Sequence, residues 1–221
     1  TAEPFLQIHP ADAASNSLRD GDLGRIQSRW GSMLARVQCD PGQRRGSVFV
    51  PMHWSAQYAA AARMGALIAP RTDPVSGQPE SKFVPVRVRP VAAACWMQLV
   101  VRAELDVSGA DFWVKTPLAN GVRYLLAFTA LGPAEAFARV RSLVATSDAC
   151  ALDWLEFADA AGGEHRLLGR DGAGVALMLH AARERACLPE AGWLADSFAC
   201  GTHDWLLLAG RGSAGATAGR P

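Results

Sequence analysis

The first part of the chain alternates apolar and polar residues over short stretches, a pattern typical of strands with one buried face. Five strands are expected, at residues 5–9, 23–29, 32–39, 46–50 and 83–88. Pro10 opens a helix expected over residues 11–18, because proline is tolerated in the first turn of a helix. Turn residues such as Asp-Gly-Asp and Asp-Pro-Gly separate the strands. Short strands with one helix in about 90 residues predict a small β-barrel.

Beyond Pro90 the turns become fewer and the apolar segments longer, which indicates a second domain. We therefore expect a mainly β domain over residues 1–90, a small α+β domain over residues 91–209, and a Gly/Ala-rich linker over residues 210–221. The elements expected in the second domain are strands at 96–103, 122–129 and 152–157, a hairpin of 164–168 and 174–180 around a turn at 169–172, and helices at 133–144, 189–198 and 203–209.

Composition and charge narrow the class of protein. Half of the 221 residues are hydrophobic and 19% are charged, a balance typical of a packed globular protein. The 22 Lys and Arg nearly balance the 21 Asp and Glu, so no net charge favours nucleic acid or an anionic membrane as partner. No apolar run reaches the roughly 20 residues of a membrane span, and no signal peptide is recognisable. We expect a cytoplasmic protein whose five scattered cysteines are reduced thiols.

The alternating pattern stops between residues 52 and 79, where Ala-, Gly- and Pro-rich stretches predict a long irregular loop. Such loops within compact domains are usually functional or disordered. Elsewhere the chemistry is sparse. The Cys200 to His203 stretch has a metal-like spacing without a second pair, and the Gly-Ser pairs at 31–32 and 46–47 are common in hairpins, so neither predicts a site.

Four sequence blocks, taken in order, carry a resemblance to a known family. They are IHPADA at 8–13, DGD at 20–22 leading to SRWGS at 28–32, VPMHW at 50–54, and DPVSGQPESK at 73–82 before VRV at 86–88. Together they resemble the dinucleotide-binding domain that closes the large subunits of the dimethyl sulfoxide reductase superfamily of molybdenum enzymes. The family fold is a double-psi β-barrel, so the resemblance implies that fold for residues 1–90.

The His-Trp pair and the DPVSG stretch most resemble the cytoplasmic assimilatory nitrate reductases. In that group the barrel is followed by a segment similar to residues 154–194, a Gly/Ala linker and a small iron–sulfur domain. The resemblance implies a C-terminal fragment that binds molybdopterin guanine dinucleotide, the molybdenum cofactor. The iron–sulfur clusters, the metal ligand and the catalytic residues are then expected outside this chain. The implied partners are the missing N-terminal catalytic portion and an electron donor protein or reductase subunit.

The resemblance also implies which residues bind the cofactor: His53, Trp54, Ser55, Gly65, Pro79, Glu80, Ser81 and Lys82. Lys82 is the candidate phosphate ligand, with a solvated surface lysine as the alternative. His53 and Trp54 contact the pterin or wall the pocket, unless His53 is a buried histidine packed on tryptophan. Asp73 and Ser76 are expected to cap the loop, because both are ordinary turn formers. Ser81 stands where the family usually has an aromatic residue, and Ala69 where asparagine is common.

Two alternative functions remain open at this point. The barrel recognises the cofactor and not the substrate, so another molybdenum or tungsten oxidoreductase, such as a formate dehydrogenase, is the first alternative. The second is a non-catalytic interaction module, in which the α+β domain docks a redox partner.

Overall fold

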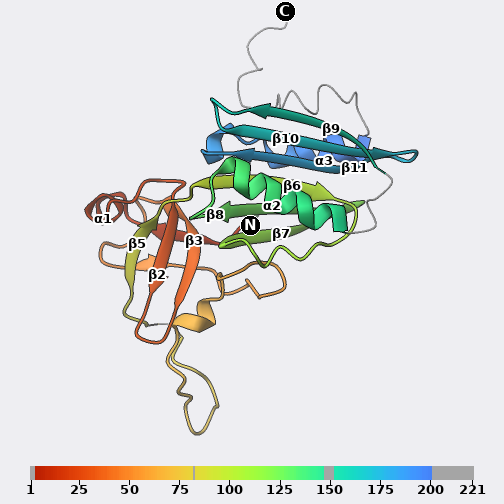
Figure 1. Ribbon diagram of the computed structural model, residues 1–221. Helices are drawn as coiled ribbons and strands as arrows, with labels where there is room; N and C mark the ends of the chain where they lie inside the picture. Colours follow the sequence, from red (N-terminus) through yellow and green to blue (C-terminus); the bar gives the residue numbers. More distant parts are fainter. Residues whose placement is uncertain (1–2, 82, 147–151, 201–221) are drawn as a thin grey trace, which may run out of the picture. The chain divides into compact units, whose positions relative to one another are not determined.

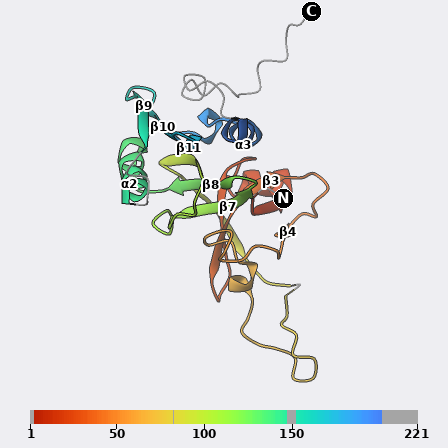
Figure 2. The same ribbon diagram turned by 90° about the vertical axis from the view of Figure 1, so that its right-hand side faces the viewer.

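The chain divides into two compact units, Thr1–Ala92 and Ala93–Pro221, in a computed structural model that describes residues 3–81, 83–146 and 152–200. Both units are built mainly of β-sheet with few helices (Figures 1 and 2). The division follows directly after the strand that contains Pro90. No helix in the described ranges is long and apolar enough to cross a membrane.

Unit 1 contains one five-stranded sheet. Its strands are β1 (Phe5–Ile8), β2 (Leu23–Gln27), β3 (Ser32–Cys39), β4 (Val48–Phe49) and β5 (Arg87–Val91), in the order β4-β1-β3-β2-β5. The β1–β3 pair is parallel, and the other three pairs are antiparallel. The alternation seen in the sequence places Ile26, Met33 and Val88 on the face that packs into the core with Leu6 and Ile8. The expected β2–β3 hairpin is confirmed.

The ends of several elements in unit 1 differ from the sequence-based prediction. Helix α1 (Pro10–Ser15) begins where expected, with the His9 Nδ1 accepting from the Ala11 N–H at 3.1 Å, but it ends three residues early. Ser17 adopts a left-handed φ of 57°, which a helix cannot continue through. The strand expected at 83–88 starts too early and ends too early, because pairing with β2 runs from Arg87 to Val91. The strand expected at 46–50 shortens to β4.

Unit 2 is a six-stranded antiparallel sheet with a helix on each face (Figure 1). Its strands are β6 (Cys95–Val101), β7 (Phe112–Leu118), β8 (Gly121–Phe128), β9 (Asp153–Asp159), β10 (Glu164–Asp171) and β11 (Gly174–Ala182), in the order β7-β8-β6-β11-β10-β9. Helix α2 (Pro133–Thr146) packs Phe137 and Val140 onto one face. Helix α3 (Ala191–Cys200) packs Leu194 onto the other, against Val100 and Met178.

Two features of this sheet were missed from the sequence. No element was expected at β7, which contains Pro117 and sits at the edge of the sheet, where a missing N–H is tolerated. The expected hairpin is confirmed, but its turn was predicted too early, because β10 continues through Gly169 to Asp171 and β11 begins at Gly174. A Cβ at Gly169 would lie 2.7 Å from the Trp154 ring, so the glycine permits close packing between neighbouring strands. The helix expected at 203–209 lies outside the described residues.

A row of polar side chains is buried on the α3 face of this sheet. Gln98 and His180 are register partners on β6 and β11, and both are almost fully buried. The Gln98 side chain donates to the Pro189 carbonyl at 2.6 Å and accepts from Arg123 at 3.3 Å. Burial, and secondarily the charge of Arg166, lower the pKa of His180 from its ordinary 6.5 to about 3. His180 is therefore neutral in the folded protein at ordinary pH.

This histidine predicts an acid sensitivity of unit 2. The unfolded chain takes up a proton at His180 below pH 6.5, whereas the folded chain does so only near pH 3. The resulting stability is complete above pH 6.5 and is lost as the pH falls towards 3, by about 2–3 kcal/mol between pH 7 and 4.5. Denaturant unfolding at both pH values should show that loss in the wild type and a smaller one in His180→Gln, which cannot titrate. An equal loss in both proteins would contradict the assignment.

Candidate functional site

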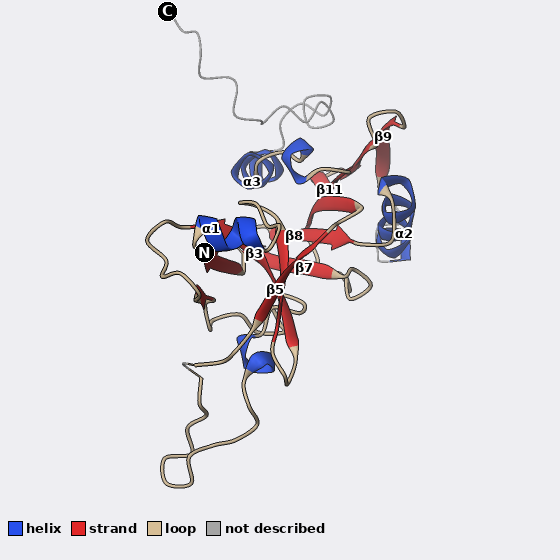
Figure 3. Ribbon diagram, turned by 90° about the vertical axis from the view of Figure 1, so that its left-hand side faces the viewer, coloured by secondary structure: helices blue, strands red, loops and turns tan. Residues whose placement is uncertain are grey.

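The eight predicted cofactor-binding residues all fall in one segment, residues 50–86, between β4 and β5. Among its described residues, the helical structure is limited to the short 3-10 helix η1 (Met64–Leu67). Figure 3 shows the segment as an extended loop that leaves the sheet and returns to it. A long irregular segment was expected here, and the structure confirms it.

The first half of the segment is fixed to the sheet at two points that the sequence did not reveal. The Leu34 N–H on β3 donates to the Ala61 carbonyl at 2.7 Å. Ala61 adopts a left-handed φ of 52°, which is strained for a residue with a Cβ. At Gly31, a Cβ would lie only 2.4 Å from the Ala66 carbonyl oxygen, so only glycine lets the β2–β3 turn approach η1. These contacts determine the path of residues 59–67.

Residues 53–55 differ in their exposure to solvent. His53 is exposed, so the alternative of a buried histidine packed on tryptophan is wrong. Trp54 is half-buried, and its indole Nε1 is shielded from solvent without a hydrogen-bond partner among the described residues. Ser55 is exposed and begins a turn in which its carbonyl accepts from the N–H groups of Tyr58 and Ala59, both at 3.1 Å. A buried N–H without a partner is unfavourable, so Trp54 stands out within this stretch.

The other predicted residues lie farther along the same segment. Gly65 is exposed within η1, and a Cβ there would meet no atom within 4 Å. Pro79 pairs with Thr72 in an isolated antiparallel bridge, Glu80 is exposed and Ser81 is half-buried. No hydrogen bond or ion pair in the described part of the chain joins residues 79–81 to residues 53–55. Lys82, the candidate phosphate ligand, lies outside the described residues, so its role stays a prediction.

A compact turn organises the tip of the loop. The Asp73 carboxylate accepts from the Val75 N–H at 3.0 Å, the Ser76 N–H at 2.7 Å and the Ser76 hydroxyl at 2.9 Å. These bonds, led by that from the Ser76 N–H, lower the pKa of Asp73. Gly77, at φ 69°, completes the turn in a conformation that favours glycine. The expectation that Asp73 and Ser76 cap the loop is therefore confirmed.

The turn displays apolar side chains to solvent. Val75 at its tip is 95% exposed, Phe83 on its return path is 79% exposed, and Met52 near the start of the segment is 66% exposed. The segment therefore exposes three large apolar side chains along its length.

The segment has properties that fit a bound dinucleotide. Such a ligand needs hydrogen-bond donors and exposed backbone that it can approach closely. Trp54 supplies a shielded donor that nothing described in the protein satisfies, and Gly65 leaves open space above the backbone. Within the described ranges no three His, Cys, Asp or Glu side chains gather as a metal site.

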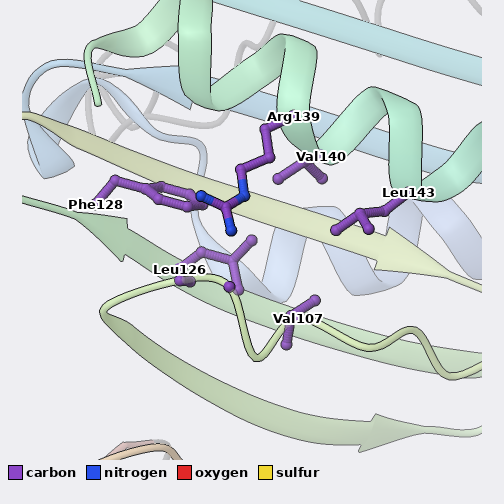
Figure 4. A pocket seen from close by; sticks show the side chains of 8 residues that line it. Val107, Leu126, Phe128, Arg139, Val140 and Leu143 are labelled. Atoms are coloured by element: carbon purple, nitrogen blue, oxygen red, sulfur yellow. The ribbon is translucent and has the colours of Figure 1, made fainter. Parts of the chain in front are cut away.

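A small apolar pocket in unit 2 is shown in Figure 4. It lies between α2 and the sheet, has a free volume of about 10 Å³, and has the Arg139 guanidinium at its side. Its lining residues are Val107, Gly109, Ala110, Leu126, Phe128, Arg139, Val140 and Leu143. This volume holds about one water molecule and no larger ligand.

The described cysteines Cys39, Cys95 and Cys187 are free thiols, and burial raises the pKa of Cys95 to about 12.

Comparison with known proteins gives the segment a family context. The family described as the molydopterin dinucleotide binding domain matches residues 1–85. A nitrate reductase of Klebsiella oxytoca is 40% identical over 123 residues, which are 56% of this chain and 14% of that protein. An assimilatory nitrate reductase catalytic subunit of Bacillus subtilis is 36% identical over 89 residues, 40% of this chain and 12% of that protein.

A relative of another kind also matches. The F420-dependent formate dehydrogenase subunit alpha of Methanocaldococcus jannaschii is 38% identical over 52 residues, 24% of this chain and 8% of that protein. The chain thus spans less than one sixth of the length of each of these three relatives. The family match covers residues 1–85, which include nearly the whole irregular segment, so this part of the chain is similar to the molydopterin dinucleotide binding domain.

Proposed function

We propose that the chain binds molybdopterin guanine dinucleotide as part of a molybdenum nitrate reductase that converts nitrate to nitrite. The observation that carries the proposal is the family match over residues 1–85, joined to the three nitrate reductases among the relatives. The bound cofactor supplies the redox chemistry of the whole enzyme. The residues of this chain bind and orient it, and none of them is assigned a catalytic role.

Within the segment, Trp54 is the residue best placed to donate to the cofactor, because its Nε1 is shielded and lacks a described partner. Exposed His53 and Ser55 flank it, and Gly65 offers close approach to the backbone. As the family resemblance implies, residues 79–81 contribute polar groups and Lys82 contributes one cation. The exposed apolar side chains Val75 and Phe83 face either this ligand or another part of the enzyme.

The proposal assigns one role to each part of the chain. Residues 1–90 form the cofactor-binding domain, for which the parallel β1–β3 pair supports the double-psi barrel of the family. Residues 91–209 form a small α+β domain, and residues 210–221 are a linker. A preceding catalytic portion, iron–sulfur clusters and an electron donor protein or reductase subunit complete the enzyme, which works in nitrate assimilation in the cytoplasm.

A formate dehydrogenase is the second candidate, because formate dehydrogenase subunits are also among the relatives. The two candidates share the cofactor and differ in the substrate. The match to the nitrate reductase of Klebsiella oxytoca covers 56% of this chain, whereas the matches to the two formate dehydrogenase subunits cover 24% and 40%, which favours nitrate.

The substrate prediction is tested on the full-length enzyme. With reduced viologen as electron source we expect reduction of nitrate, and with an oxidised dye no oxidation of formate. The 221-residue chain alone should be inactive, because the assigned catalytic portion lies outside it. Formate oxidation without nitrate reduction would establish the second candidate, and turnover by the chain alone above a molybdenum-free control would refute the division of roles.

The role of Trp54 is tested by Trp54→Phe in the full-length enzyme, which keeps an aromatic ring and removes the N–H. One net hydrogen bond of about 0.5–1.5 kcal/mol corresponds to roughly a two- to twelvefold weaker hold on the cofactor. Molybdenum and released guanine nucleotide per polypeptide should fall when cofactor supply is limiting. The matched control is Trp30→Phe, which changes an exposed tryptophan in the β2–β3 turn. Equal occupancy in both variants would exclude Trp54 as a donor.

The role of Lys82 is tested by Lys82→Ala under the same limiting supply. Loss of a charge-assisted hydrogen bond of about 1.5–3 kcal/mol predicts roughly ten- to hundredfold weaker binding with unchanged circular dichroism. Arg44→Ala removes an exposed cation outside the segment and serves as the control. Unchanged occupancy in Lys82→Ala would assign this lysine to the solvated surface.

A further inference from the structure

The outward face of the β2–β5 pair carries three arginines. Arg25 on β2 lies directly opposite Arg89 on β5, and Arg87 follows two residues away on the same face of β5. Ile26 and Val88, their neighbours in sequence, point into the core, so strand alternation turns all three arginines outward. All three are exposed. Figure 1 shows β5 at the edge of the sheet, next to β2.

This arrangement of like charges is unfavourable by itself. Side chains directly opposite each other on antiparallel strands approach to about 5 Å, and like charges there destabilise the pair. Among the residues that the structure describes, none of the three arginines forms an ion pair. On the same face of the sheet, Arg36 does bind a carboxylate, Glu3, at 2.8 Å. The protein therefore neutralises one arginine of this face and leaves three together.

The excess of Lys and Arg in residues 1–92 adds to the positive charge around this face. Residues 1–92 contain eleven Lys and Arg against seven Asp and Glu, whereas the whole chain is nearly balanced. The positive charge of the protein is thus concentrated in unit 1, and the β2–β5 face presents three of its cations in a fixed register. Fixed guanidinium groups bind carboxylates in a bidentate manner.

We propose that the β2–β5 arginine face, formed by Arg25, Arg87 and Arg89, is a docking surface for an acidic protein that associates reversibly with this chain. Its chemistry favours such a partner over a permanent subunit, because permanent interfaces are more apolar and reversible encounters are steered by exposed charge. Three cations are fewer than the six to ten phosphate contacts of a typical nucleic-acid site. The surface lies outside the proposed cofactor segment, so the inference does not depend on cofactor binding.

The test measures binding of fluorescently labelled poly-L-glutamate to the full chain by anisotropy, at low salt and without cofactor. Arg25→Glu/Arg89→Glu should weaken binding at least roughly tenfold, because attraction becomes repulsion at the centre of the face. The matched control is Arg19→Glu/Arg44→Glu, which changes the net charge equally at two exposed arginines elsewhere in unit 1. It should retain most of the affinity, and Arg25→Lys/Arg89→Lys should retain an intermediate affinity.

Equal losses in the two Glu double variants would overturn the proposal, because net charge and not this face would then determine binding. Tighter binding of a 20-residue oligodeoxythymidylate, with the same dependence on Arg25 and Arg89, would overturn it in favour of nucleic acid.

A second measurement, of thermal stability, does not depend on the probe. Arg89→Thr should raise the melting temperature at low salt, and the rise should vanish at high salt. An unchanged melting temperature at low salt would show that the arginines do not repel each other and would also contradict the proposal.

Discussion

The backbone of β3 needs hydrogen-bond partners along both of its edges, and the arrangement of the candidate site depends on how that need is met. β2 pairs with β3 from Ser32 to Arg36, whereas β1 pairs with it only from Arg36 onward. The first residues of β3 are left with a free edge, and the Leu34 N–H there is satisfied by the Ala61 carbonyl. An unsatisfied backbone group in a buried strand is costly, so this bond is one of the two points at which the irregular segment is fixed to the sheet.

The attachment explains two local features that have no other evident cause. Ala61 is held in a left-handed conformation, which costs a residue with a Cβ about 1–2 kcal/mol and persists only where the surroundings enforce it. Ala59 and Ala62 beside it are almost completely buried, so small side chains are required for this approach. The path so defined continues into η1 and its contact with Gly31. Trp54, whose indole N–H is shielded, lies a few residues upstream.

The sequence allowed prediction of those elements whose pattern is local. Alternation defined β2 and β3, and the longer apolar runs located the central strands of unit 2. It failed where packing between distant residues decides the outcome. Gly169 was interpreted as a turn residue, but its role is set by the Trp154 ring on the neighbouring strand. β7 was missed because Pro117 is acceptable only at an edge, and an edge is a property of the assembled sheet.

The same distinction applies to the candidate site. The break in alternation and the motif resemblance located the segment, and turn chemistry correctly predicted the Asp73 cap, since both depend on neighbouring residues. The shielded Nε1 of Trp54 and the constraint at Gly31 arise from contacts that no local pattern encodes. The assignment of individual cofactor ligands remains a prediction from the resemblance.

Unit 1 presents two surfaces of different chemistry, and the difference bears on how a chain of this kind functions within a larger assembly. The loop from 50 to 86 exposes Met52, Val75 and Phe83, whose contact with water is unfavourable until another group covers them. The arginine face on β2 and β5 is well hydrated, but its like charges repel one another. Salt or an acidic partner relieves that repulsion. Apolar exposure favours a lasting contact, whereas unpaired charge favours a fast and reversible one. Because the two surfaces belong to different elements, one sheet can hold a bound group through its loop while its outer face remains available to a partner that comes and goes.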